Sequence, residues 1–282
     1  MSEFYDFFWG TAETNRNFDI NIETTDTPLA RSVALESFRS LVLARPDAGS
    51  LRSDDEFLIR FLAARKMNVP DAMLVYNNYY SFLRRNHELI SDYGVDNVEV
   101  KQALEDGLPG VLQQRDRRGR RIMVLFAAEW DPSRYSVSTI QKKRNAFMLQ
   151  AIHISLDLLL QDSVVQDRGL VLIIDWSQFS FRQYSKLQPA VLHSIAHGLE
   201  YCYPVRFKAI HCVGPPWYVD AAMSLLKPFL RETSRAKIFS CGNNLSILHQ
   251  AVSREILPAE LGGEQGPYLS SIWIDNLRRA QV

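Results

Sequence analysis

The chain is poor in cysteine, which limits the classes of protein to which it can belong. It has three cysteines in 282 residues, Cys202, Cys212 and Cys241, and none of them forms a C-x-x-C pair. Such spacing gives neither a disulfide framework nor a cysteine-paired metal site. We therefore expect the protein to work in a reducing compartment.

Excess charge and long apolar runs are also missing. Lys plus Arg and Asp plus Glu both number 32, so the whole molecule offers no strong field to nucleic acid. No apolar run reaches the roughly 18 residues that a membrane span needs. The first ten residues, MSEFYDFFWG, are acidic and aromatic, unlike a secretory signal or a transit peptide. These absences predict a cytoplasmic monomer that does not bind nucleic acid.

The chain lacks the common motifs of enzyme active sites. It has no phosphate-binding glycine loop, nucleophile elbow or zincin motif. His193 and His197 stand one helical turn apart, but Ser194 takes the place of the zincin glutamate and no third ligand is evident. Asp175 ends a predicted strand, where it is either a structural cap or a catalytic acid. We expect no metal, no cofactor and no enzymatic activity; a hydrolase that uses Asp175 and a histidine is the alternative.

Residues 1–30 predict an acidic, disordered tail. They hold six acidic residues against one basic residue and show no helical or strand period. Five aromatic residues near the start could still dock on the body of the protein or on a partner: Phe4, Tyr5, Phe7, Phe8 and Trp9.

Residues 31–93 have the pattern of a small helical domain. Apolar residues recur three and four positions apart, as in Phe57, Phe61 and Leu62. Ser53 followed by Glu56 matches a capping box, which places a helix start there. A break at residues 68–70 then separates this helix from the next.

From residue 94 the pattern changes to strands that alternate with helices. Strands are predicted at 121–127, 169–175, 209–214 and 237–241, with helices at 137–161, 185–202 and 215–231. This alternation favours an α/β fold with a mostly parallel sheet covered by helices. The continuous apolar run LVLII indicates that both faces of the sheet are buried. The basic run RDRRGRR (115–121) is interpreted as a solvated hairpin turn.

The predicted helix at 215–232 is unusually apolar. Its polar residues Asp220, Ser224, Lys227 and Arg231 form one narrow stripe, and apolar residues cover the rest. Such a helix is either buried on two sides, or buried on one side and exposed to lipid on the other.

Basic residues surround this helix in an otherwise neutral chain. Six bases lie between residues 202 and 237, against Asp220 and Glu232: Arg206, Lys208, Lys227, Arg231, Arg235 and Lys237. An anionic surface is the natural partner for this cluster, and phosphoinositide headgroups suit bases beside a lipophilic helix.

Several ordered blocks of the sequence resemble the CRAL-TRIO lipid-binding family, in particular its clavesin-like and alpha-tocopherol transfer protein-like members. The blocks are DDEFLIRFLAARKMNVPDA, GLPGVLQQRDRRGR, LIIDWSQFSF, YPVRFKAIH, KPFL, GNNLSILH and ILPAELGG. The resemblance covers roughly residues 30–265. The resemblance implies a CRAL-TRIO fold preceded by a small all-helical domain. It divides the chain into the tail (1–30), a helical domain (31–93), a lipid-binding domain (94–265) and a C-terminal extension (266–282).

The resemblance also implies a closed cavity for one hydrophobic molecule, shut by a mobile helix at 215–230. The implied cavity residues are Ile152, His153, Leu156, Ile174, Phe179, Leu187, Val191, Ile195, Leu199 and Ile210, with Val219, Met223, Leu226 and Phe229 on the mobile helix. The implied phosphoinositide-binding bases are Arg206, Lys208 and Lys237. Thr233 replaces a further base of the family pattern, so Arg231 or Arg235 is expected to substitute for it.

The cargo implied by the resemblance is an isoprenoid, retinoid, tocopherol-like molecule or other lipid. Ile152 and Leu156 stand where the tocopherol carrier has small hydroxyl residues, which argues against vitamin E. We expect a non-enzymatic carrier that exchanges its cargo at endosomal or other phosphoinositide-bearing membranes as a peripheral protein. The alternative is a membrane-trafficking adaptor without a transfer role.

Overall fold

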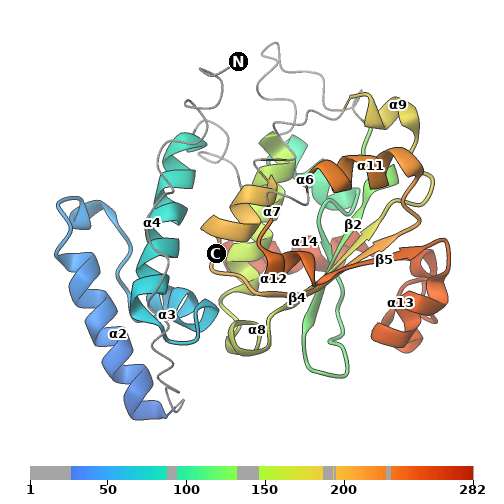
Figure 1. Cartoon of the computed structure of the whole chain (residues 1–282). Helices are drawn as coiled ribbons and strands as arrows, with labels where there is room; N and C mark the ends of the chain where they lie inside the picture. The colour runs from blue at the N-terminus through green and yellow to red at the C-terminus, as the bar shows by residue number, and fades with distance from the viewer. Residues whose placement is uncertain are drawn as a thin grey trace.

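The protein is described here from a computed structural model, which covers residues 27–87, 94–131, 146–186, 193, 195–226 and 230–281 (Figure 1). Of the predicted tail (residues 1–30), residues 1–26 lie outside the described residues. From Pro28 the chain is helical, because Thr27 caps the first helix by accepting a hydrogen bond from the backbone N–H of Ala30.

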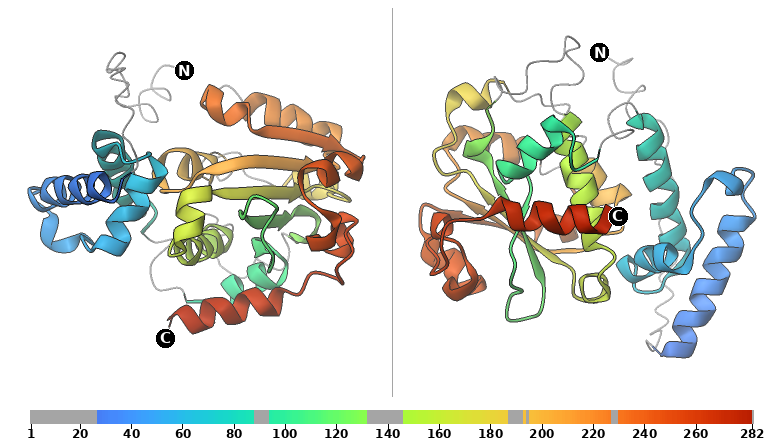
Figure 2. Two further views of the ribbon diagram at one scale, coloured as in Figure 1. Left: turned by 90° about the horizontal axis from the view of Figure 1, so that it is seen from below. Right: turned by 180° about the vertical axis from the view of Figure 1, so that it is seen from behind.

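Three helices form the N-terminal unit that the apolar spacing predicts: α2 (Pro28–Leu43), α3 (Asp55–Ala64) and α4 (Val69–Arg85), with a short 3₁₀ turn η1 (Ala48–Ser50). Phe38, Phe61 and Tyr76 are fully buried where these helices meet. Their rings contact one another edge-on or tilted, with centroids 5.2 to 6.4 Å apart. The unit lies beside the sheet, with α2 outermost (Figure 2).

The predicted capping box at the start of α3 is wrong. Asp54, and not Ser53, is the N-cap, and its carboxylate accepts the backbone N–H of Phe57 at 3.0 Å. Arg52 holds the same carboxylate at 3.0 Å. An ionised carboxylate is the stronger acceptor at a helix N-terminus, because it also interacts favourably with the helix dipole.

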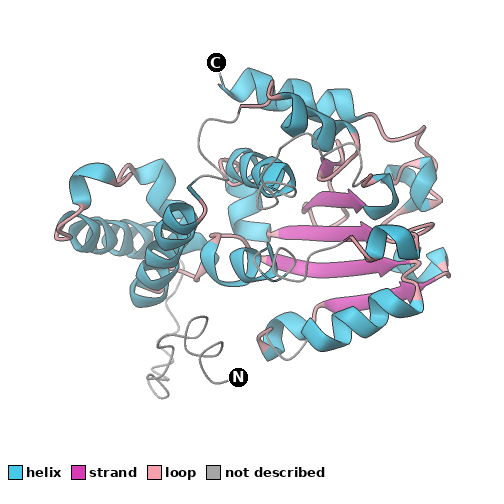
Figure 3. Ribbon diagram, turned by 90° about the horizontal axis from the view of Figure 1, so that it is seen from above, coloured by secondary structure: helices cyan, strands magenta, loops and turns pink. Residues whose placement is uncertain are grey.

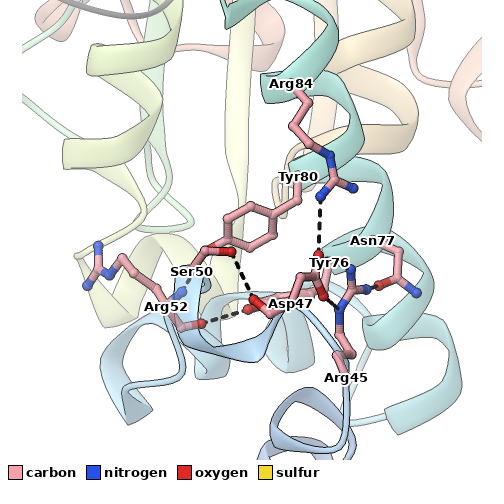
Figure 4. Close-up of polar contacts among 8 residues, drawn as sticks. All are labelled: Arg45, Asp47, Ser50, Arg52, Tyr76, Asn77, Tyr80 and Arg84. Carbon is pink, nitrogen blue, oxygen red and sulfur yellow. Dashed lines mark hydrogen bonds and ion pairs between the residues drawn. The ribbon is translucent and has the colours of Figure 1, made fainter.

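Asp47 organises the loop between α2 and α3. Arg45 holds its carboxylate through two hydrogen bonds of 2.8 and 2.9 Å, and Arg84 of α4 adds a third at 3.2 Å (Figure 4). The Arg45 hydrogen bonds are the main reason that the pKa of Asp47 falls to about 2. Nearby, the hydroxyls of Tyr76 and Tyr80 bond the backbone of Arg52. The loop is therefore fixed to α4.

In the described part of the chain, five strands form one sheet in the order β1-β2-β3-β4-β5. They are β1 (Gly110–Val111), β2 (Arg121–Phe126), β3 (Leu170–Asp175), β4 (Phe207–Val213) and β5 (Ile238–Gly242). Strands β2 to β5 run parallel, and β1 pairs antiparallel with β2. The α/β fold with a mostly parallel sheet is thus confirmed.

The predicted basic hairpin is also confirmed. Asp116 is buried and accepts the backbone N–H groups of Arg118 and Arg120 at 2.9 and 2.8 Å. Its other carboxylate oxygen pairs with the Arg120 guanidinium at 2.6 Å. These bonds close the turn between β1 and β2, which gives the run of arginines a structural role.

Helices cover the sheet, as Figure 3 shows. Val171 and Ile173 of β3 pack on one face with Leu248 of α13 (Leu245–Ala251), whereas Leu170 and Leu172 belong to the core on the other. The remaining elements are α6 (Val98–Glu105), η2 (Ala127–Glu129), α7 (Ala146–Leu159), α8 (Ser163–Arg168), α9 (Phe181–Tyr184), the π-helix η4 (Gly198–Cys202), α11 (Trp217–Leu226), α12 (Glu232–Arg235), the 3₁₀ turns η6 (Arg254–Ile256) and η7 (Ala259–Leu261), and α14 (Ser270–Gln281). Within the described part of the chain, no helix combines the length and apolar character that crossing a bilayer requires.

Two partly buried contacts help to join the helical unit to the sheet unit. Arg60 of α3, which is 3% exposed, pairs with Asp157 of α7 at 2.7 Å. His153 of α7 bonds the hydroxyl of Tyr203 at 2.9 Å, and Tyr79 of α4 packs against both rings. These contacts bring the end of α3 against the edge of the sheet unit.

Candidate ligand-binding cavity

A cavity of about 410 Å³ lies between the sheet, α7 and α11. Leu172 and Ile174 of β3 line it because alternate residues of a strand share a face. Ile210 of β4 extends this floor, and Met148 and Ile152 of α7 form a side wall. The volume is within the range of about 300 to 1,000 Å³ that is typical of small-molecule sites.

Helix α11 covers the cavity with one face. Val219, Ala222 and Met223 line the cavity, whereas Asp220 and Ser224 are exposed. The hydroxyl of Tyr218 donates to the carbonyl of Phe179, which ties the first turn of α11 to the segment after β3. The sequence predicts a helix through residue 231, but residues 230 and 231 are not helical, and Arg231 is the N-cap of α12.

The structure brings most of the predicted cavity residues together. The lining includes Ile152, Ile174, Phe179, Ile195, Leu199, Ile210, Val219 and Met223. Leu187, Val191 and Phe229 lie outside the described residues, as does the side chain of Leu226.

Two residues of the predicted set lie elsewhere. His153 follows Ile152 on α7, but successive helical residues point about 100° apart, and His153 faces Tyr79 and Tyr203 at the helical unit. Burial lowers the pKa of His153. Leu156 is fully buried in the core and is not part of the lining.

The five predicted headgroup-binding bases divide into two groups. Arg206, Arg231 and Lys237 line the cavity, whereas Lys208 and Arg235 do not and are exposed. Burial lowers the pKa of Lys208, and repulsion from Arg206 and Lys237 lowers it further, so these three cations are close neighbours.

Arg206 has a structural role in addition. Its guanidinium donates to the carbonyls of Gln166 and Asp167 at the end of α8, the latter at 2.6 Å. Burial lowers the pKa of Arg206, and its Nε is buried without a hydrogen-bond partner among the described residues. The side chain therefore caps α8 while it faces the cavity.

The same end of the cavity contains polar residues that the sequence did not single out. Glu200 of η4 accepts a hydrogen bond from Ser234 at 2.9 Å and lies 3.7 Å from Arg231. The Arg231 guanidinium also stacks over Tyr201, 4.7 Å from the ring centroid. Arg65, at the C-terminus of α3, joins this lining from the helical unit.

The residues considered for enzymatic chemistry, Asp175, His193 and His197, do not line the cavity. Asp175 accepts the backbone N–H of Ser177 at 2.9 Å, as a strand-end cap does, and burial raises its pKa. His193 and His197 stack with centroids 6.2 Å apart, and His197 lies 3.6 Å from the sulfur of Cys202. Within the described ranges, no three His, Cys, Asp or Glu residues are grouped as metal ligands.

Comparisons with known proteins agree with this architecture. The chain is 42% identical to Clavesin-1 of Rattus norvegicus and 41% identical to Clavesin-2 of Homo sapiens, each over 256 residues. These matches cover 91% of this chain and 70% and 76% of the respective relatives. The crystal structure of Sfh5 superposes with a TM-score of 0.56 over 95% of this chain and 100% of that chain, at 14% identity, which shows a shared fold.

The family model of the CRAL/TRIO domain matches residues 105–263, which include the sheet, α11 and all of the cavity lining except Ala64 and Arg65. Membership of this family supports a lipid-binding role like that of transfer proteins. The fold, the family match and the relatives lead to one conclusion: the chain belongs to the CRAL/TRIO domain family.

Proposed function

We propose that this protein is a carrier that holds one hydrophobic molecule in the cavity under α11 and exchanges it at phosphoinositide-containing membranes. The main support is the cavity itself, whose floor is apolar and whose cover is a single helix. Burying an apolar chain stabilises the complex by about 0.8 kcal/mol per methylene, partly offset by ordering the chain. An enclosed site removes more of the apolar surface of the chain from water than a surface groove does, and therefore binds it more tightly.

The exposed bases suit membrane docking. Lys208 and Arg235 make no ion pair among the described residues, so phosphate groups of a membrane can reach them. Exposed Trp217, at the start of α11, supplies an aromatic side chain of the kind that sits at the membrane–water interface. We propose that headgroups hold the bases while α11 moves aside into lipid, which shifts the closed–open equilibrium toward open.

Vesicle sedimentation tests the docking step. Lys208→Glu combined with Arg235→Glu should weaken binding to vesicles that contain phosphatidylinositol phosphates by about tenfold or more, because each charged contact contributes about 1.5–3 kcal/mol. Binding to pure phosphatidylcholine vesicles and loading of a fluorescent fatty-chain probe should not change. Arg279→Glu on α14 is the control, since α14 and α11 lie on opposite sides of the strands (Figure 2). Undiminished binding by the double variant would rule out this docking site.

A transfer assay tests the carrier role directly. The wild-type chain should speed the movement of a fluorescent lipid from donor to acceptor vesicles, and phosphatidylinositol phosphates in the acceptor should increase the rate. Vesicle binding without any transfer would favour the adaptor alternative.

A further inference from the structure

Exposed bases gather outside the cavity, where the strands of the parallel sheet begin. Four of them form one surface, called the hairpin surface below: Arg117 and Arg118 at the tip of the hairpin between β1 and β2, Arg168 of α8 and Lys208 of β4. The guanidinium of Arg168 donates to the carbonyl of Arg118 at 3.0 Å, which joins α8 to the hairpin. The side chain of Lys208 lies against Gly169, the residue after Arg168, so the surface continues onto β4.

The acids next to the hairpin surface already have partners. There are three: Asp116, which bonds the backbone of the hairpin, Asp162, which pairs with Arg115, and Asp167, which pairs with Arg31. In the described part of the chain, no carboxylate lies within ion-pair distance of the four bases themselves. Like charges that gather on a surface repel one another, and an anionic partner relieves that repulsion. The hairpin surface therefore suits an acidic partner.

The matching negative charge lies in the first 26 residues of the chain. They hold six acidic residues and one basic residue, a net charge of −5, and because the whole chain is neutral the remaining residues carry +5. The same segment has five aromatic residues between positions 4 and 9. Guanidinium groups pair with carboxylates and also stack on aromatic rings, so both features of the segment fit a surface of arginines.

The acidic segment enters the structure next to these bases. Arg31, in the first turn of α2, lies 3.4 Å from the carboxylate of Asp167, and Asp167 directly precedes Arg168. Figure 1 shows the start of α2, α8 and the hairpin at the same, lower end of the molecule. A chain of this length spans at most roughly 90 Å, which is ample to cross the hairpin surface. Tethering makes the association intramolecular, with an effective concentration on the order of millimolar.

We propose that residues 1–26 bind the hairpin surface of their own chain and cover Lys208. Surface ion pairs are individually weak, but here several act together and the tether keeps the partners close. The consequence rests on the proposed function: because Lys208 is one of the two docking bases, the segment and an anionic membrane compete for it. A membrane must then carry enough anionic lipid to displace the segment before the protein docks.

Zero-length cross-linking with a carbodiimide tests the proposal in the full chain, because this reagent joins a carboxylate to an amine only where the two are in contact. Carboxylates of residues 1–26 should join Lys208, and 1 M sodium chloride should suppress the reaction by screening the charges. Lys186 is the internal control, since it is exposed after α9 at the opposite end of the sheet (Figure 1) and should join few of them. A mixture of isotopically light and heavy chains shows whether each bond forms within one chain.

Two double variants with the same change in net charge separate the hairpin surface from charge in general. Arg117→Glu with Arg118→Glu should lower the yield at Lys208 by about fivefold or more, because two attractive contacts become repulsive. Arg182→Glu with Arg279→Glu should leave that yield unchanged, since both side chains are exposed on other elements, α9 and α14.

Vesicles provide the second readout. Phosphatidylinositol phosphate vesicles should lower the yield at Lys208, whereas pure phosphatidylcholine vesicles should not. An unchanged yield on vesicles that do bind the chain would show that the segment does not cover the docking base, and would overturn the proposal. If the chain binds neither kind of vesicle, the proposed docking fails, while the cross-links in solution still decide the proposal, so the two failures are distinguishable.

Two results in solution would also overturn the proposal. Cross-links spread evenly over Lys208 and Lys186, or equal yields in the two double variants, would show that the segment has no preferred site. Bonds mainly between light and heavy chains would make the occupant the segment of a second copy.

Discussion

At the residue scale, the lowered pKa of Asp47 makes the stability of the N-terminal unit depend on pH. The Arg45 hydrogen bonds lower this pKa from 3.8 to about 2 in the folded chain. When folding lowers the pKa of an acid, the acid stabilises the folded state at any pH above its pKa in the unfolded chain. This stabilisation is lost as the pH falls through its pKa in the folded chain. The contribution should therefore be complete at neutral pH and disappear between about pH 4 and pH 2.

Asp47→Asn should lower the free energy of unfolding at neutral pH and flatten its dependence on pH in the acid range. The difference between wild type and variant, measured by urea unfolding, should shrink as the pH is lowered toward 2. Asp71→Asn on α4 is the control, because the Asp71 side chain is exposed and makes no hydrogen bond or ion pair among the described residues. A difference that stays constant down to pH 2 would contradict the role assigned to Asp47.

The Arg60–Asp157 pair allows a second comparison between single residues. Asp157→Asn leaves the buried Arg60 without its counter-charge and should destabilise the chain by about 1–3 kcal/mol. Asp167→Asn removes the partner of Arg31 in an exposed pair at 3.4 Å and should cost less than about 1 kcal/mol. Equal losses of unfolding free energy in the two variants would show that the Arg60–Asp157 pair, in which only Arg60 is buried, does not hold the two units together.

At the scale of elements, the sequence predicts the sheet better than the helix ends. Strand β3 is a continuous apolar run buried on both faces, so its composition alone identifies it. Helix starts depend on which of several adjacent polar residues caps the backbone, and here Asp54 caps in place of Ser53 because Arg52 supports it. The sequence also carries the helix at 215–231 too far, since Arg231 is the N-cap of α12.

Helix α11 exposes less apolar surface than the sequence predicts. The sequence predicts apolar surface on two sides, but Trp217 is the one large apolar side chain exposed among its described residues, at 76%. It contacts Tyr218, which packs in turn on Phe181 and Tyr184 of α9. A cluster of rings at the start of α11, in which Trp217 and Phe181 are exposed, is suited to the membrane interface.

Trp217→Ala should weaken binding to phosphoinositide vesicles by about five- to tenfold, because the variant loses an aromatic side chain that would be buried in lipid. Tryptophan fluorescence of the wild type should shift to shorter wavelength when vesicles are added. Leu29→Ala on α2 is the control, since Leu29 is 74% exposed on the outermost helix (Figure 1). The same loss in both variants would mean that exposed apolar area in general, and not α11, drives binding.

At the scale of the whole molecule, the cavity depends on contacts that sequence patterns alone do not reveal. The apolar floor follows from strand alternation, so Leu172 was predictable once Ile174 was chosen. Arg65 was not, because it reaches the cavity only once the helical unit packs against the sheet unit, where Arg60 pairs with Asp157. His153 was assigned to the cavity from the resemblance, but it lies in the contact between the two units, where it packs against Tyr79.

The central claim is that the space under α11 holds the cargo. Native mass spectrometry of the purified chain, incubated with cell lipids, tests it most directly. The wild type should retain one lipid molecule per chain, and Ile210→Trp and Met223→Trp, which fill the cavity from its floor and from its cover, should each lose it while remaining folded. A wild type that retains no lipid, or folded variants that retain as much as the wild type, would contradict the account.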